Sequence, residues 1–211
     1  ADAPGVPADW MHIEGLNVHG YAAPEDYNTL SRLVAYTDEA VPRISKRLAL
    51  PSGAKIHLYL ADTQENFHAL QPGKAPDWAD GTAWPHRGLI YLRSPRVRPG
   101  TASPLEQVLD HEIVHILLGR AFGPQPVPRW LQEGMAQWVA GEYNPEVTER
   151  LGKGMLGGGL LTLDDLTSGF PRDPVRANLA YAQSADLVAY ISGEYGAEAL
   201  NDIVHRMATG T

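Results

Sequence analysis

Two histidines and a glutamate stand close together in the segment His111-Glu112-Ile113-Val114-His115, which has the pattern H-E-x-x-H. On a helix, residues four apart lie on one face, so both imidazoles can reach the same metal ion. Zinc is commonly held in proteins by imidazole nitrogens. Glu112 is rotated by roughly 100° from His111, near the ion but poorly placed as a ligand. The segment therefore predicts a zinc site in which Glu112 acts as the general base.

A third protein ligand is expected, because catalytic zinc sites keep three protein ligands and one open position. Leu118 and Ala121 occupy the positions where the longer motif H-E-x-x-H-x-x-G-x-x-H would have Gly and His, which excludes that pattern. The chain has no Cys, so the ligand must be His, Asp or Glu. Glu133 follows His115 by 18 residues, enough to end one helix, turn and return. We expect Glu133 to be the third ligand, with Gly134 allowing its helix to approach the zinc helix closely.

Hydrophobic periodicity and turn residues predict the elements that position these side chains. We expect strands at residues 12–21, 55–60 and 88–93, and helices at 24–48, 62–70, 103–119, 128–140, 178–195 and 197–208. Pro42 should kink or split the first of these helices. Residues 71–87 read as a loop, and the glycine-rich residues 152–159 read as a lid or a flexible connector.

Composition narrows the class of protein. The 211 residues are 44% hydrophobic and 20% charged, which is typical of a globular chain with one sizeable core or two lobes sharing it. The net charge of −8 disfavours nucleic-acid binding. No apolar run approaches the roughly 20 residues that span a bilayer. Residues 1–5 lack a start Met and an apolar signal core, which fits a mature end after signal cleavage or an artificial boundary.

The H-E-x-x-H segment is followed by W-L-Q-E-G-M-A at residues 130–136, and together they resemble the gluzincin metallopeptidases. The closer resemblance is to small bacterial peptidase MA-like domains, strong over residues 105–140 and looser over GLIYLRSP and LAYAQSADLVAYISGEYG. We expect an α+β, zincin-like fold, with a small mixed sheet and the zinc helix in an N-terminal lobe at 1–120. A helical C-terminal lobe at 121–211 would carry Glu133, with the active-site cleft between the lobes. The resemblance also implies one zinc ion per chain, a peptide or protein substrate, and a secreted or cell-envelope location.

The resemblance assigns roles to further residues. In gluzincins an edge strand before the zinc helix pairs with the extended substrate, and that role would fall to Gly88, Leu89, Ile90 and Tyr91. Tyr181, in the segment A-Y-A-Q-S, would donate to the oxyanion, unless it is a core Tyr that packs its helix.

Three more residues could support the metal ligands. Many gluzincins have an Asp one turn after the glutamate ligand to orient a zinc-bound His, but this chain has Gln137 there. Asp110 or another carboxylate could take over that role. Ser184, one turn after Tyr181, would either support the site or pack the helix.

The residues and the resemblance together predict a zinc-dependent peptidase. The absence of the aminopeptidase signature G-A-M-E-N favours an endopeptidase. One alternative is a zinc-containing peptide-binding module with weak or no activity. Another is a helical protein with an accidental motif, which would hold no stoichiometric metal. The oligomeric state is not predicted.

Overall fold

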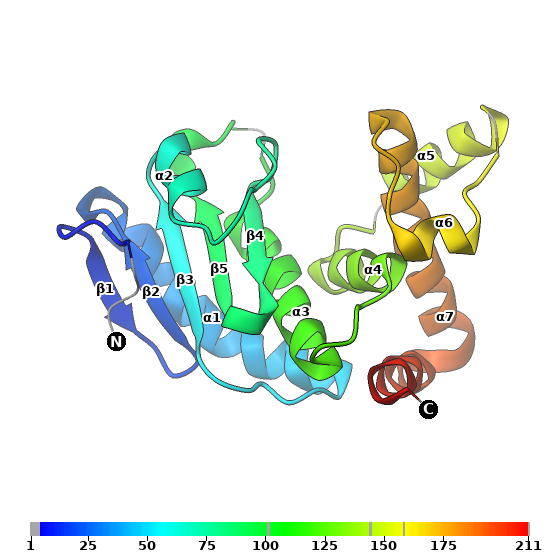
Figure 1. Cartoon of the computed structure of the whole chain (residues 1–211), viewed down its shortest axis with the longest axis horizontal. Coiled ribbons are helices and arrows are strands. Elements are labelled where there is room, and N and C mark those ends of the chain that lie inside the picture. The colour runs from blue at the N-terminus through cyan, green and yellow to red at the C-terminus, as the bar shows by residue number, and fades with distance from the viewer. Residues whose placement is uncertain (1–4, 101, 144, 158, 211) are drawn as a thin grey trace. The chain divides into compact units, whose positions relative to one another are not determined.

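The computed structural model describes residues 5–100, 102–143, 145–157 and 159–210. Contacts divide the chain into two units, residues 1–117 and 118–211, and the boundary falls within helix α3 (Leu105–Phe122). The first unit contains a five-stranded sheet and the second is helical (Figure 1). The predicted α+β class, with a mixed sheet in the N-terminal part and a helical C-terminal part, is confirmed. Among the described residues, no helix is both long and apolar enough to cross a membrane.

The sheet has the order β1-β2-β3-β5-β4. Its strands are β1 (Met11–Glu14), β2 (Val18–Ala22), β3 (Ile56–Ala61), β4 (Gly81–Trp84) and β5 (Leu89–Arg93). The three inner strands are parallel, and β1 and β4 run antiparallel at the two edges. The single strand predicted at residues 12–21 is in fact a hairpin, because residues 15–17 turn the chain. The loop predicted at residues 71–87 contains the edge strand β4.

Two helices cover the same face of the sheet. A Cβ added to Gly20 on β2 would lie 2.7 Å from Val34 Cγ2 of α1 (Tyr27–Leu48). A Cβ added to Gly81 on β4 would lie 2.7 Å from Val108 Cγ1 of α3. The strand registers place both glycines on one face, because side chains alternate along each strand. The glycines therefore let α1 and α3 lie close against the sheet.

The opposite face of the sheet carries rings in cross-strand rows. Tyr59 stacks between Tyr21 and Tyr91, with ring centroids 5.0 and 4.7 Å apart. Phe67 of α2 (Gln64–Ala69) packs into the same cluster and is fully buried. Burial raises the pKa of Tyr91 to about 12, so its hydroxyl stays neutral at physiological pH. The short helix α2 thus shields one part of this face.

Helix α1 runs through Pro42 without a break, so the predicted split does not occur. Pro42 has no N–H to donate to the carbonyl of Asp38, one turn earlier. The side-chain amide of Asn17 donates to that carbonyl instead, at 3.2 Å. The Asp38 carboxylate in turn accepts the backbone N–H groups of Leu16 and Asn17, at 2.8 and 2.7 Å. The β1–β2 turn therefore supplies a hydrogen bond to the helix carbonyl that Pro42 leaves without its usual donor.

The helices of the second unit are α4 (Arg129–Ala140), α5 (Pro145–Leu156), α6 (Leu163–Ser168) and α7 (Pro174–Thr209). Helix α4 ends as predicted, with Gly141 in the left-handed conformation at φ 71°. Helix α7 is interrupted at Gly196, where φ is 85°, as the two predicted helices on either side of that residue require. Residues 152–156, predicted to be flexible, belong to helix α5.

Gly134 brings α4 against α7, and not against the zinc helix as predicted. A Cβ at this position would overlap the backbone carbonyl oxygen of Ser184 and approach Val188 Cγ2 at 2.8 Å. Ser184 is fully buried, and its hydroxyl donates to the Ala180 carbonyl at 2.7 Å within α7. Of its two predicted roles, the contacts of Ser184 are those of a packing residue.

Replacing Asp38 with Ala should destabilise the protein, because two backbone N–H groups of the hairpin turn lose their acceptor. We expect the free energy of unfolding, measured by urea denaturation, to fall by about 1–3 kcal/mol. Glu39→Ala removes the neighbouring, exposed carboxylate and should change it by less than about 0.5 kcal/mol. Equal losses in the two variants would contradict the structural role of Asp38.

Candidate metal centre

Helix α3 presents His111 and His115 one turn apart, with ring centroids 4.7 Å apart and ring planes at 79°. Glu133 comes from the second turn of α4. One potential ligand atom from each of these residues lies within 4.8 Å of the other two. Nowhere else in the described part of the chain do three His, Asp or Glu side chains form such a group.

The chemistry of this group fits zinc. Two imidazoles and one carboxylate make a common set of three protein ligands that leaves a fourth position open. His115 is 8% exposed and Glu133 is 4% exposed. A carboxylate buried to this extent requires positive charge nearby. The guanidinium of Arg129, 3.0 Å from Glu133 Oε1, supplies some of it, and a divalent cation bound by the group would supply more. The group is therefore consistent with an H-E-x-x-H zinc site.

Glu112 lies beside the edge strand of the sheet. Its side chain is buried, with 6% exposed. A Cβ added to Gly81, the first residue of β4, would lie 3.1 Å from Glu112 Cγ. The strand that was expected to be a loop thus begins against the predicted general base.

The prediction that residues 88–93 form the edge of the sheet is wrong. Strand β5 pairs with β3 on one side and with β4 on the other. The Gly88 carbonyl accepts the N–H of His57 at 2.8 Å. The main chain of Gly88, Leu89, Ile90 and Tyr91 lies inside the sheet and cannot add a substrate strand. The edge near α3 belongs to β4.

The ladder between β4 and β5 shows which β4 groups face outward. The N–H of Arg93 donates to the Asp80 carbonyl at 3.0 Å, so these residues form a hydrogen-bonded pair. Such pairs alternate along an antiparallel ladder. Thr82 and Trp84 therefore direct their main-chain groups to β5, whereas Gly81 and Ala83 direct theirs away from it. A sequence signal existed in Pro85-His86-Arg87-Gly88, a turn between two short β-prone segments.

Asp110 joins α3 to α1. One guanidinium nitrogen of Arg43 donates to both carboxylate oxygens at 2.9 Å, and the same nitrogen lies 3.1 Å from the Tyr36 hydroxyl. Burial and the nearby Asp110 carboxylate raise the pKa of Tyr36. The Asp110 carboxylate thus serves the packing of α1 against α3, and its role in orienting a ligand histidine stays a prediction.

Gln137 ties α4 to α7. Its amide nitrogen donates to the Tyr181 carbonyl at 3.2 Å and lies 3.4 Å from the Glu133 carbonyl. Gln137 is 6% exposed, so these contacts lie in the interior of the helical unit. The amide N–H groups of Gln137 are thus directed to helix backbone, one turn from the predicted ligand Glu133.

Tyr181 is connected to Glu133 through an arginine that sequence reasoning missed. A guanidinium nitrogen of Arg129 lies 3.0 Å from Glu133 Oε1 and 3.5 Å from the Tyr181 hydroxyl. The Tyr181 ring packs edge-to-face on Phe170, with centroids 4.8 Å apart. The spacing of four residues between Arg129 and Glu133 was visible in the sequence, because such residues are neighbours on a helix.

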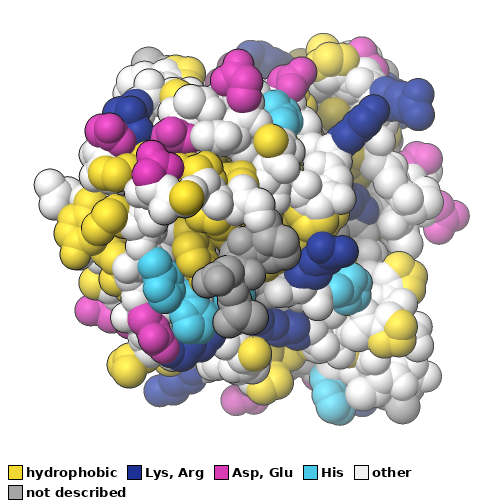
Figure 2. Space-filling model, turned by 60° about the vertical axis from the view of Figure 1, so that its left-hand side comes forward, with side chains coloured by type: hydrophobic (Ala, Val, Ile, Leu, Met, Phe, Trp, Pro, Cys, Tyr) yellow, Lys and Arg dark blue, Asp and Glu magenta, His cyan; other side chains and the backbone are white. Residues whose placement is uncertain are grey.

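Three other histidines stack on the face of the sheet opposite to α1 and α3. His19 lies between His12 and His57, with ring centroids 5.7 and 5.0 Å apart and planes within 28° of parallel. Burial, and then the neighbouring His19, lowers the pKa of His57, which favours its neutral form. Figure 2 shows histidine side chains gathered beside hydrophobic ones on one surface of the molecule. His86, in the short turn Pro85–Arg87 that follows β4, is exposed.

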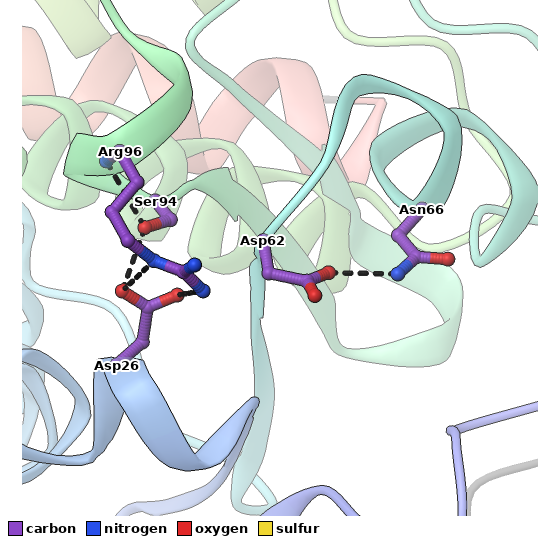
Figure 3. A network of polar contacts seen from close by, with 5 residues as sticks. All are labelled: Asp26, Asp62, Asn66, Ser94 and Arg96. Carbon is purple, nitrogen blue, oxygen red and sulfur yellow. Dashed lines mark hydrogen bonds and ion pairs between the residues drawn. The ribbon is translucent and has the colours of Figure 1, made fainter.

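A polar cluster at the carboxyl ends of the parallel strands is structural (Figure 3). Arg96 contacts both oxygens of Asp26, at 3.1 and 2.9 Å, and Ser94 donates to Asp26 at 2.8 Å. Asp26 is 3% exposed, and these bonds compensate its buried charge. Nearby, Asn66 donates to Asp62 at 2.7 Å. The cluster fixes the turn before α1 to the end of β5.

The family model of the Peptidase MA superfamily matches residues 37–211, which include H-E-x-x-H, Glu133 and strand β4. No curated protein matches the chain closely enough to count as a relative. Since the family match covers far more than half of its length, the chain belongs to the Peptidase MA superfamily.

Proposed function

We propose that this protein is a zinc-dependent peptidase that cleaves peptide bonds within extended chains. The observation that carries the proposal is the approach of His111, His115 and Glu133, whose ligand atoms lie within 4.8 Å of one another. When bound there, zinc supplies a Lewis acid that polarises a peptide carbonyl and lowers the pKa of water. Membership of the Peptidase MA superfamily supports the same reaction class.

Glu112 is the proton carrier in this proposal. It follows the ligand His111 directly on α3, and its side chain is shielded from bulk solvent. The carboxylate takes a proton from the attacking water as oxygen bonds to the carbonyl carbon. It then gives that proton to the amine nitrogen as the carbon–nitrogen bond breaks. One carboxylate thus serves as base and then as acid.

The substrate would pair with β4. Gly81 and Ala83 direct their main-chain groups away from β5, and Gly81 lies against Glu112. An extended peptide that adds to this edge would form main-chain hydrogen bonds next to the general base. Because this recognition uses the main chain and not a terminus, it favours internal cleavage.

Tyr181 is the proposed oxyanion donor. Its hydroxyl lies in the same cluster as Arg129 and Glu133, and Phe170 packs against its ring. A donor fixed before the reaction stabilises developing negative charge without a cost of reorganisation.

Protein prepared without a metal-binding tag should contain one zinc per chain by elemental analysis. Glu133→Ala should weaken zinc binding by more than the roughly 10–100-fold typical of a lost outer hydrogen bond, because a direct ligand is removed. His205→Ala, which changes an exposed histidine of α7, should bind zinc like the native protein. A native protein without stoichiometric metal would instead support the accidental-motif alternative.

Glu112→Gln should retain zinc and lose peptide hydrolysis, with kcat lower by roughly 10²–10⁴-fold, because the amide cannot accept the proton. Hydrolysis of a quenched fluorescent peptide library measures this, together with the zinc content. Glu65→Gln on α2 is the matched control at an exposed position. If the native protein holds zinc but cleaves no peptide in such libraries, the peptide-binding alternative gains and the enzyme proposal fails.

Ala83→Pro should lower kcat/KM by about two- to tenfold, because one main-chain donor to the substrate is lost. Proline is tolerated at edge positions whose N–H faces away from the ladder, so the fold should persist by circular dichroism. Ala83→Ser keeps the N–H and should behave like the native enzyme. An unchanged kcat/KM for the proline variant would exclude strand addition at this position.

A further inference from the structure

Arg129 lies at the centre of a small cluster within the helical unit. Its guanidinium nitrogen is 3.0 Å from Glu133 Oε1 and 3.5 Å from the Tyr181 hydroxyl. Its Cζ atom lies 5.5 Å from the centre of the Phe170 ring, within the range of a cation–π contact. The Arg129 side chain is 41% exposed, whereas that of Glu133 is 6% exposed. The arginine therefore bridges the surface and the buried carboxylate.

The placement of Arg129 opposes the usual electrostatics of a helix. It is the first residue of α4, where the partial positive charge of the helix N-terminus disfavours a cation. The order of the pair is also the weaker one, since a carboxylate four residues before a cation stabilises a helix better than the reverse. The stability of α4 thus gives no reason for this pair. The buried Glu133 carboxylate gives a reason, because it requires a hydrogen-bond donor that holds its orientation.

We propose that Arg129 is a positioning residue for the metal ligand. By holding Oε1 of Glu133, it restricts the orientation of the carboxylate that would bind the cation. The same guanidinium keeps Tyr181 close to that carboxylate, and Phe170 supports both side chains. Ligating carboxylates are commonly hydrogen-bonded in this way, and the bond restricts their orientation. This inference rests on the proposed zinc site and concerns its affinity.

Lysine cannot reproduce this arrangement in full. A planar guanidinium can donate in two directions while it stacks on an aromatic ring, whereas an ammonium is a compact point charge. Arg129→Lys keeps the charge and a donor within reach of Glu133, but it loses the planar, two-directional donor that contacts Glu133 and Tyr181 together. Arg129→Met keeps much of the length and removes both charge and donor. Comparing the two variants therefore separates the effect of the bond to Glu133 from the effect of side-chain length.

The test is the zinc dissociation constant, measured by competition with a chromophoric chelator on the full chain. Arg129→Met should weaken zinc binding at least about tenfold, and Arg129→Lys should recover part of that loss. The visible spectrum of the Co²⁺-substituted protein should change in Arg129→Met, since the ligand field depends on carboxylate orientation. The melting temperature of the metal-free variants shows whether the fold is retained.

Arg206→Met is the matched control, because Arg206 also pairs with a carboxylate four residues away, Asp202 at 2.7 Å. It should bind zinc like the native protein. Native-like or tighter zinc binding by Arg129→Met, in a folded protein, would overturn the positioning role. A native protein that binds no zinc would refute the proposed function itself. Zinc binding without hydrolysis would refute only the peptidase activity and leave this measurement decisive.

Discussion

Helix α3 carries three buried polar side chains, and each of them contacts a different part of the structure. Asp110, Glu112 and His115 are each less than a tenth exposed. Burying a charge is costly unless another charge or hydrogen bonds compensate it. Asp110 pairs with Arg43 of α1, the Glu112 side chain packs beside Gly81 of β4, and His115 joins the candidate metal group. One helix thus links the packing of its unit to the candidate metal site.

Side-chain contacts of Thr82 and Trp84 anchor the edge strand β4. The main-chain groups of Gly81 and Ala83, which point away from β5, take no part in these contacts. Gln71 is 9% exposed, and its side-chain oxygen accepts from the Thr82 hydroxyl at 2.7 Å and from the Trp84 indole at 3.1 Å. A Cβ at Gly73 would overlap the Trp84 ring, so the preceding loop packs tightly on this strand. Four residues would make a weak strand by themselves, and these side-chain contacts anchor it.

The sequence alone predicted the features that depend on residues close together in the chain. The spacing of His111 and His115, the return to Glu133 and the breaks at Gly141 and Gly196 follow from helix geometry and glycine conformation. Strand β4 was missed because G-T-A-W is too short to show alternation and depends on pairing with β5. Because β4 was missed, residues 88–93 were wrongly expected to form the edge of the sheet. The partners of Asp110 and Pro42, Arg43 and Asn17, lie far away in the sequence, and no local pattern announces them.

The hydrogen bond from the Asn17 amide to the Asp38 carbonyl of α1 matters when the chain is shortened. The family match begins at residue 37, inside α1 and after the whole β1–β2 hairpin. A fragment cut at that boundary would start in mid-helix, with the Asp38 carbonyl deprived of its side-chain donor. It would also expose the flank of β3 that now pairs with β2. The smallest fragment with an intact sheet begins at β1, so homology limits alone would misplace the cut.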